Sequence, residues 1–272
     1  MINFLDVEKE ASKIRQQYGI ETYGIKDIFS LIERMDINLI RYPFGRDILC
    51  GLSTVFEGKK VIVSNSSEIL TREIFTIAHE VAHLLYDFEA YDQEIKIDFD
   101  LRSVNRDISE KRAHYFAGCL LMPKTKLLEY MNFELQKDPV KNPEKLRGLD
   151  IVRIQMEFST SYSATLTRLR ELGLIGRSHE KRLYDEQEIY SSARLFEMIN
   201  ADERLLKPAE EIRIPARFLE YAISNYENGY VPFSSLSKAL GLVGIDASIF
   251  KKDADKRETE VPSDDCSREF CK

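Results

Sequence analysis

The spacing of apolar residues divides the first part of the chain into helices and strands. Apolar residues recur every three or four positions in two segments, which predicts amphipathic helices. They then alternate with polar residues in three segments, which predicts strands, and Glu57-Gly58-Lys59 is typical of a hairpin turn. We therefore expect a small antiparallel sheet. The predicted helices span 5–17 and 25–35, and the predicted strands span 37–42, 50–56 and 60–64.

Helical spacing dominates the rest of the chain. A strongly apolar helix comes first, with Ser67 as a candidate cap, and a later helix ends at Pro123. A polar, acidic connection separates these two helices, and residues 136–148 are typical of a loop. The charged residues 251–272 are expected to be disordered. The predicted helices span 68–87, 108–122, 149–158, 162–172, 185–200, 214–228 and 234–240.

The motif His79-Glu80-Val81-Ala82-His83 carries the strongest chemical signal. Residues four apart lie on the same face of a helix, so both imidazoles can hold one metal ion. Glu80 lies about 100° round the helix from His79, where it can reach a metal-bound water rather than the metal. This HExxH arrangement is the one that a zinc hydrolase requires.

The surroundings of the motif favour a metal site over a pair of ordinary core histidines. Apolar residues flank it on nearly every face of the helix, which predicts that the helix is buried. Buried polar side chains must be satisfied, and one metal ion would satisfy all three. Hydrogen-bonded core histidines with a salt-bridged glutamate are the weaker interpretation.

A catalytic zinc site usually takes a third protein ligand. Glu110 is the best candidate, because Ala113 and Ala117 on the same face would let its helix approach the first one closely. The alternative is that Glu110 forms a capping box with Asp107, three residues earlier, and we favour the ligand. The weaker candidates for the third ligand are Asp87, Asp98 and Asp100.

His114 lies four residues after Glu110, on nearly the same helical face. It can support a metal ligand, stabilise the transition state, or be a core histidine bonded to a backbone carbonyl, and these roles stay open. Tyr86 and Tyr115 are further candidates for stabilising an oxyanion. A substrate strand could pair with an edge of the sheet at residues 50–56.

Two stretches of the chain resemble the ImmA/IrrE family of bacterial metallopeptidases. One surrounds the HExxH motif at 72–85, and the other runs from Glu110 to Pro123. The resemblance covers about residues 1–130 and extends more loosely to 149–175. The sequence departs from the family at Ala82, where glycine is frequent, and at His114, where asparagine is frequent.

The resemblance implies a ligand set and a mechanism. By position, His79, His83 and Glu110 would bind zinc, or another divalent metal in its place. Glu80 would act as the general base, taking a proton from the attacking water and giving it to the leaving amine. We expect His114, beside Glu80, to be a second catalytic candidate.

The implied fold class is α+β: a small zincin-like peptidase domain with a short antiparallel sheet and an HExxH helix, followed by mostly helical C-terminal regions. The expected divisions are 1–135 for the peptidase domain, 145–180 for a helix-turn-helix-like region, 185–250 for a helical C-terminal domain and 251–272 for the tail.

The resemblance further implies a zinc-dependent endopeptidase that cleaves or inactivates a transcription factor of the Xre helix-turn-helix type. Such cleavage would relieve repression in a phage, a mobile element or a stress response. The alternative is a non-cleaving toxin or partner-binding protein with a structural metal, paired with a helix-turn-helix antitoxin. A structural zinc site would need a fourth protein ligand, whereas a catalytic one keeps a position open.

Residues 149–175 themselves resemble a helix-turn-helix. Between 145 and 182 there are eight Lys or Arg against four Asp or Glu, so DNA contact is conceivable, with Arg168 and Arg170 as the residues to test. We favour a scaffold helix pair, because so small an excess supports few phosphate contacts. The net charge of −7 also argues against a dedicated nucleic-acid binder.

The remaining composition indicates where the protein acts. No apolar run approaches the roughly 18 residues of a membrane helix, and the first residues do not match a secretion signal. The four cysteines are scattered along the chain. We therefore expect a reduced, cytoplasmic protein with no membrane partner.

Overall fold

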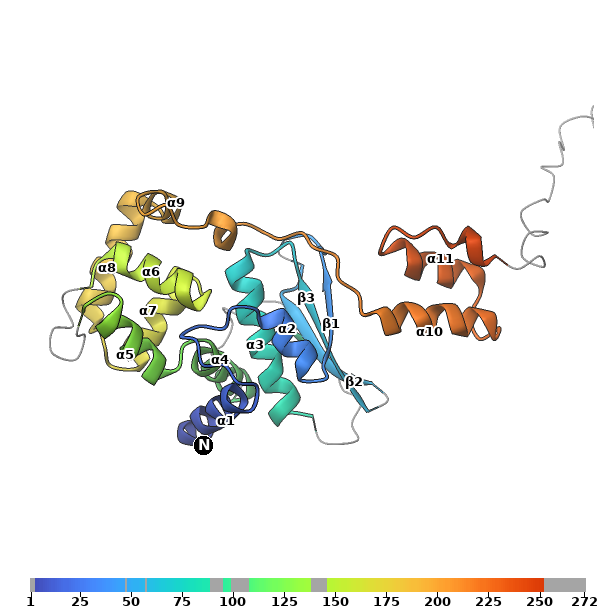
Figure 1. The fold of residues 1–272 in the computed structure, drawn as a ribbon, viewed down its shortest axis with the longest axis horizontal. Coiled ribbons are helices and arrows are strands. Elements are labelled where there is room, and N and C mark those ends of the chain that lie inside the picture. Colours follow the sequence, from blue (N-terminus) through green and yellow to red (C-terminus); the bar gives the residue numbers. More distant parts are fainter. Residues whose placement is uncertain are drawn as a thin grey trace, which may run out of the picture. The chain divides into compact units, whose positions relative to one another are not determined.

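The computed structural model describes residues 3–46, 48–56, 58–88, 95–98, 108–137 and 146–251. Its contacts divide the chain into two compact units, Met1–Arg213 and Ile214–Lys272 (Figure 1). The sequence placed a boundary at residue 185, but that residue lies inside helix α8 (Arg177–Tyr190), and the first unit continues to Arg213. The tail expected over 251–272 lies outside the described residues from 252 onward.

The first unit contains a four-stranded sheet in the order β1-β3-β2-β4. The prediction of an antiparallel sheet is correct for β2, which runs antiparallel to β3 and β4, and wrong for β1, which runs parallel to β3. The reason is that the β2–β3 hairpin lies with β3, not β2, beside β1. The strands are β1 (Asn38–Tyr42), β2 (Gly51–Phe56), β3 (Lys59–Asn65) and β4 (Ile95–Asp98).

The expectation of a sheet edge at residues 50–56 is also wrong. Gly51 to Thr54 pair with β4, so this part of β2 is an inner strand. Strand β4 falls within the polar connection for which the sequence predicted no element, because its four residues are too short to show a clear period. An edge of the sheet is therefore β4.

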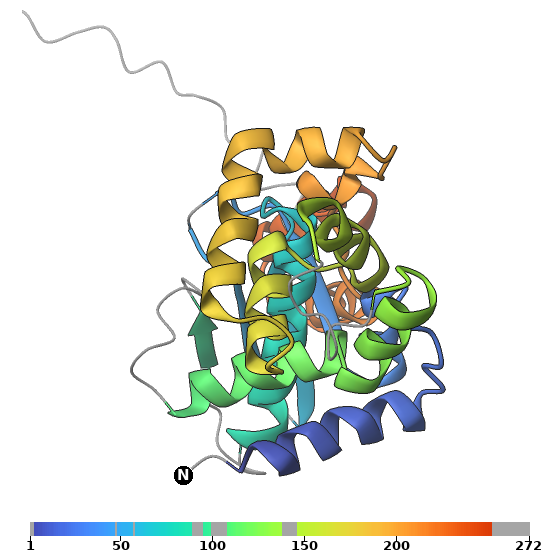
Figure 2. The ribbon, with the colours of Figure 1, turned by 90° about the vertical axis from the view of Figure 1, so that its left-hand side faces the viewer.

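Helix α3 (Leu70–Tyr86) packs against β2 and β3, and its residues from 73 to 84 are all buried. Helix α4 (Ile108–Leu121) packs against α3 and against α1 (Phe4–Gln17) (Figures 1 and 2). Ala113 and Ala117 of α4 are buried, as expected for a close approach of the two helices. Ser67 does not cap α3; its hydroxyl accepts a hydrogen bond from the backbone N–H of Gly45 instead.

Helices α5 to α9 enclose a second apolar core within the first unit. The sequence predicted no helix at α5, which begins directly after Pro123. The helix expected over 185–200 is two helices, because Ser191 adopts a φ of 58° that no helix accommodates. The elements are α5 (Lys124–Phe133), α6 (Gly148–Phe158), α7 (Tyr162–Glu171), α8, α9 (Ser192–Glu197) and the 3-10 helix η3 (Glu203–Leu206).

Two further elements support this unit. Helix α2 (Ile28–Arg34) packs next to β1, and Asp27 caps its first turn. Residues 207–213 pass the start of α3 and the outer side of β1, where Arg41 and Arg213 exchange backbone hydrogen bonds of 2.8 and 2.9 Å. This extended segment is the last part of the first unit.

The second unit is a small helical structure of its own. Helices α10 (Ala216–Glu227) and α11 (Phe233–Gly241) pack together, followed by the 3-10 helix η4 (Ala247–Phe250). Its core holds four buried residues, Tyr226, Leu236, Leu240 and Ala247. Across both units, none of the described helices is long and apolar enough to cross a membrane.

Candidate metal centre

The two histidines of the HExxH motif lie one turn apart on α3, and their side chains are 0% and 2% exposed. Burial follows from the apolar residues on the other faces of the helix, which pack between the sheet and α4. Glu110 comes from the first turn of α4, and its side chain is one-third exposed. The three predicted ligands therefore come from two packed helices.

Their ligand atoms converge on one point. The Nε2 atoms of His79 and His83 are 3.0 Å apart. The carboxylate oxygens of Glu110 lie 3.1 Å from Nε2 of His79 and 3.3 Å from Nε2 of His83. Two nitrogens bound at roughly 2.0–2.1 Å to one tetrahedral ion would be about 3.3 Å apart, so the residues fit a zinc-sized cation.

The charges of the site support the same interpretation. Hydrogen bonds from His79 and His83 hold the pKa of Glu110 well below its usual range. Burial alone would lower the pKa of His83, but its contacts with Asp87 and Glu110 raise that pKa to about 9. The site thus holds an ionised carboxylate beside the imidazole of His83, and a divalent cation bound there would replace the proton of that imidazole.

Glu80 is fully buried on the same helix, beside the start of strand β2. A side chain at Gly51 would place its Cβ 2.5 Å from Thr76 and 3.6 Å from Cγ of Glu80. Only glycine therefore lets β2 pass this close to the helix face that carries Glu80. The buried carboxylate lies near enough to His83 to act on the charge of that imidazole.

His114 lies beside the ligands without joining them. Its ring centroid is 6.5 Å from that of His79 and 4.8 Å from that of Phe75. Burial, and then the charge of His79, lower the pKa of His114 to about 4, so its imidazole is neutral at neutral pH. Of the three candidate oxyanion stabilisers it is the one in ring contact with a ligand.

The two tyrosines are engaged elsewhere. The hydroxyl of Tyr115 donates a hydrogen bond to Glu8 on α1, and the ring of Tyr86 packs against Arg112 and Phe116. These contacts turn the hydroxyl of Tyr115 away from the role that the sequence left open.

Of the weaker ligand candidates, Asp87 is not placed as a ligand. Its Oδ2 lies 2.5 Å from Nδ1 of His83, the ring nitrogen that does not face Glu110. The side chain of Asp98 and all of Asp100 and Asp107 lie outside the described residues, and with them the proposed capping box. Arg112, which donates a hydrogen bond to Asp87, was not predicted from the sequence. The one available signal was the spacing of Asp87, four residues after His83.

The helix pair α6–α7 places Arg168 where DNA cannot reach it. Its side chain is 2% exposed, donates to the carbonyl of Met122 and contacts Sγ of Cys119. Arg168 therefore stabilises the junction of α4 and α7, so this one of the two arginines named for a test of DNA contact is buried inside the protein. Arg170 is half exposed and pairs with Glu180 on α8.

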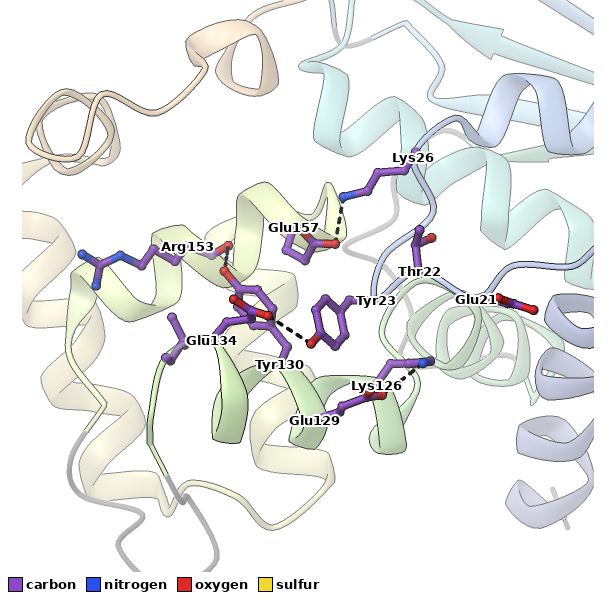
Figure 3. Close-up of a pocket in the computed structure, with 11 residues that line it drawn as sticks. Glu21, Thr22, Tyr23, Lys26, Lys126, Glu129, Tyr130, Glu134, Arg153 and Glu157 are labelled. Atoms are coloured by element: carbon purple, nitrogen blue, oxygen red, sulfur yellow. Dashed lines mark hydrogen bonds and ion pairs between the residues drawn. The ribbon is translucent and has the colours of Figure 1, made fainter.

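A separate polar groove of about 650 Å³ lies between the segment 21–26, α5 and α6 (Figure 3). Its floor holds Tyr23 and Tyr130, edge to face at 5.3 Å. Its lysines pair with its own glutamates: Lys26 with Glu157 and Lys126 with Glu129. These pairs balance most of the charge of the groove, and we assign it no chemistry.

A family of peptidases defined by the IrrE N-terminal-like domain matches residues 20–170, more than half of the chain. The chain belongs to this family. None of the curated proteins matches it. As an IrrE-like protein it carries a metallopeptidase domain of α+β, zincin-like fold, and the expected resemblance is confirmed. The match includes α6 and nearly all of α7, so this helix pair is continuous with the family domain.

Proposed function

We propose that this IrrE-like protein is a zinc-dependent endopeptidase that cleaves a repressor of the Xre helix-turn-helix type. The observation that carries the enzymatic part is the convergence of three ligand atoms from His79, His83 and Glu110 beside the buried carboxylate of Glu80. The family match supports the reaction class. The choice of repressor rests on the resemblance to ImmA/IrrE proteins.

The residues of the site divide the chemistry between them. Zinc held by the three ligands would polarise the scissile carbonyl and lower the pKa of the attacking water. Glu80 accepts the proton of that water and returns it to the leaving amine. The imidazole of His114 can donate an N–H to the developing oxyanion, because its ring lies beside that of His79.

A catalytic metal is favoured over a structural one. A closed structural site takes four protein ligands. Within the described part of the chain, the converging ligand atoms come from three side chains. His114 stays outside this group, and Asp87 contacts the opposite nitrogen of His83. Among the described residues no fourth side chain joins the three ligands, and a fourth coordination position open to water and substrate would favour the enzyme over the non-cleaving toxin.

Strand β4 supports an extended substrate. It pairs with β2 at Gly51, the residue that borders Glu80, and lies at an edge of the sheet. An extended peptide that added to this edge would make main-chain hydrogen bonds to β4, one strand away from the residue that borders Glu80. Such binding needs an unfolded or exposed segment in the repressor.

The decisive experiment is incubation of this protein with a purified repressor of the Xre helix-turn-helix type in the presence of zinc, with cleavage as the readout. We expect Glu80→Gln to bind zinc as wild type does and to cleave about 10²–10⁴-fold more slowly. Glu68→Gln is the matched control, because Glu68 is also buried next to α3 but pairs with Arg72. Equal cleavage by Glu80→Gln and wild type would contradict the mechanism. Zinc binding without any cleavage would favour the partner-binding alternative.

A further inference from the structure

A second set of polar side chains joins α3 to α4 directly behind the metal ligands. Nδ1 of His83 lies 2.5 Å from Oδ2 of Asp87, and the other oxygen of Asp87 accepts a hydrogen bond from Arg112 of α4. The guanidinium of Arg112 also lies over the ring of Tyr86, 4.6 Å from its centroid. Asp87 is 10% exposed and Arg112 is 26% exposed, so this contact is largely shielded from water.

We propose that Asp87 and Arg112 are positioning residues that set the affinity of the site for zinc. The proposal rests on the proposed function, because it takes His83 as a metal ligand. Neither residue is one of the three side chains whose ligand atoms converge. Both act through His83: Asp87 by direct contact, and Arg112 by holding Asp87.

The role of Asp87 follows from the two nitrogens of imidazole. A neutral histidine carries one proton, and only the nitrogen without it can bind a metal. A carboxylate beside Nδ1 keeps the proton there, so Nε2 presents its lone pair to the cation. The negative charge of Asp87 also makes the imidazole a stronger donor toward the metal. Without Asp87, His83 would divide its population between two tautomers and more than one ring orientation.

The role of Arg112 follows from its place in the chain. It lies two residues after Glu110, in the helix that supplies the third ligand, and bonds to the last turn of the helix that supplies the other two. The stacking on Tyr86 holds the guanidinium of Arg112 where it can reach Asp87. Arg112 therefore fixes Asp87 and, through it, the spacing between His83 and Glu110.

The test measures zinc affinity of the full chain by competition with a chromophoric chelator. We expect Asp87→Ala to bind zinc about 10–100-fold more weakly than wild type. Asp87→Asn keeps an oxygen that can accept from Nδ1 and should lose less. Arg112→Gln should weaken binding by a smaller factor than Asp87→Ala, and the double variant should bind as Asp87→Ala does, because Arg112 acts through Asp87.

The chain offers a matched control pair. Glu68 and Arg72 form an ion pair at the other end of α3, at 3.0 Å, with side chains 8% and 24% exposed. Glu68→Gln and Arg72→Gln should leave zinc affinity unchanged, although they remove an ion pair of the same burial. Unfolding by urea without zinc, measured for every variant, separates loss of affinity from loss of folding.

The outcomes distinguish this proposal from the proposed function. If wild type binds no zinc, the proposed function fails and the positioning role fails with it. If wild type binds zinc and Asp87→Ala binds it equally tightly, only the positioning role is wrong. An equal loss of affinity in Asp87→Ala and Glu68→Gln, or a further loss in the double variant, would also overturn it.

Discussion

The two ends of helix α3 bury polar groups in different ways. Near its start, the fully buried carboxylate of Glu73 accepts two hydrogen bonds of 2.8 Å from Arg41 and another from Ser64. Near its end, two imidazole nitrogens lie 3.0 Å apart and face a carboxylate. The first group is satisfied by the protein itself, whereas the lone pairs of the second repel one another unless a proton or a cation lies between them.

The difference separates a structural cluster from a functional one on the same helix. Arg41 contacts Glu73 and Glu211, and its guanidinium lies over the ring of Phe29, 3.8 Å from the centroid. These contacts join α2, β1, α3 and the segment 207–213. The metal ligands join only α3 and α4. Buried polarity alone therefore does not identify a site; convergence of metal-binding atoms does.

The largest effect on the free energy of unfolding is expected when the structural cluster of Arg41, Glu73 and Ser64 is broken. Arg41→Met leaves the Glu73 carboxylate buried without its guanidinium, which should cost about 3–5 kcal/mol of the free energy of unfolding. Urea unfolding of the zinc-free protein measures this cost. Glu211→Gln is the control, because Glu211 is half exposed and its pair with Arg41 should contribute at most about 1 kcal/mol. Similar losses in both variants would contradict the distinction between the two ends.

The metal ligands should show the opposite pattern. Zinc at 100 times its dissociation constant should stabilise wild type by about 2.7 kcal/mol, because it binds the folded state. His83→Ala should remove this stabilisation while changing the zinc-free protein less than Arg41→Met does. Urea unfolding with and without zinc gives both numbers. If zinc stabilised His83→Ala as much as wild type, then His79, His83 and Glu110 would not form the zinc site.

The sequence predicted the convergence of His79, His83 and Glu110 better than the order of the strands around them. His79, Glu80 and His83 lie within about one turn of the same helix, so the period of α3 alone sets their relative positions. Glu110 required a second helix, and the small residues Ala113 and Ala117 supplied a local reason for its approach. Each of these inferences uses neighbours within about one to two turns.

The features that the sequence missed depend on long-range contacts. The parallel pairing of β1 with β3 depends on which strand of the β2–β3 hairpin lies beside β1. The alternation of apolar and polar residues along β1 would be the same whether β2 or β3 lay there. Arg168 has the charge and spacing of a DNA contact, yet it is buried against residues 46 and 49 positions earlier in the chain. Arg112 was missed because its partner lies on another helix.

The smallest effect on stability is expected from the N-cap of α2, the helix whose Phe29 packs against Arg41. Asp27 caps this helix by accepting from the backbone N–H and the hydroxyl of Ser30, at 3.0 and 2.6 Å. The cap holds the first turn that carries Phe29 against Arg41. Asp27→Ala should cost about 1 kcal/mol, and Asp27→Asn less, because asparagine keeps an acceptor. Zinc should stabilise both variants as much as wild type, since the cap serves only the first end of α3.

The pH dependence of the free energy of unfolding tests whether the charge of Asp27 contributes to this cap. Partial burial would raise the pKa of Asp27, but the hydrogen bonds from Ser30 outweigh it and lower that pKa. A carboxyl with a lowered pKa in the folded state stabilises the protein above its unfolded pKa of about 3.9, and this contribution is lost as the pH falls further. The advantage of wild type over Asp27→Asn should therefore shrink between about pH 6 and about pH 3. A constant difference over this range would mean that the charge of Asp27 does not contribute, and that the cap acts through its oxygen alone.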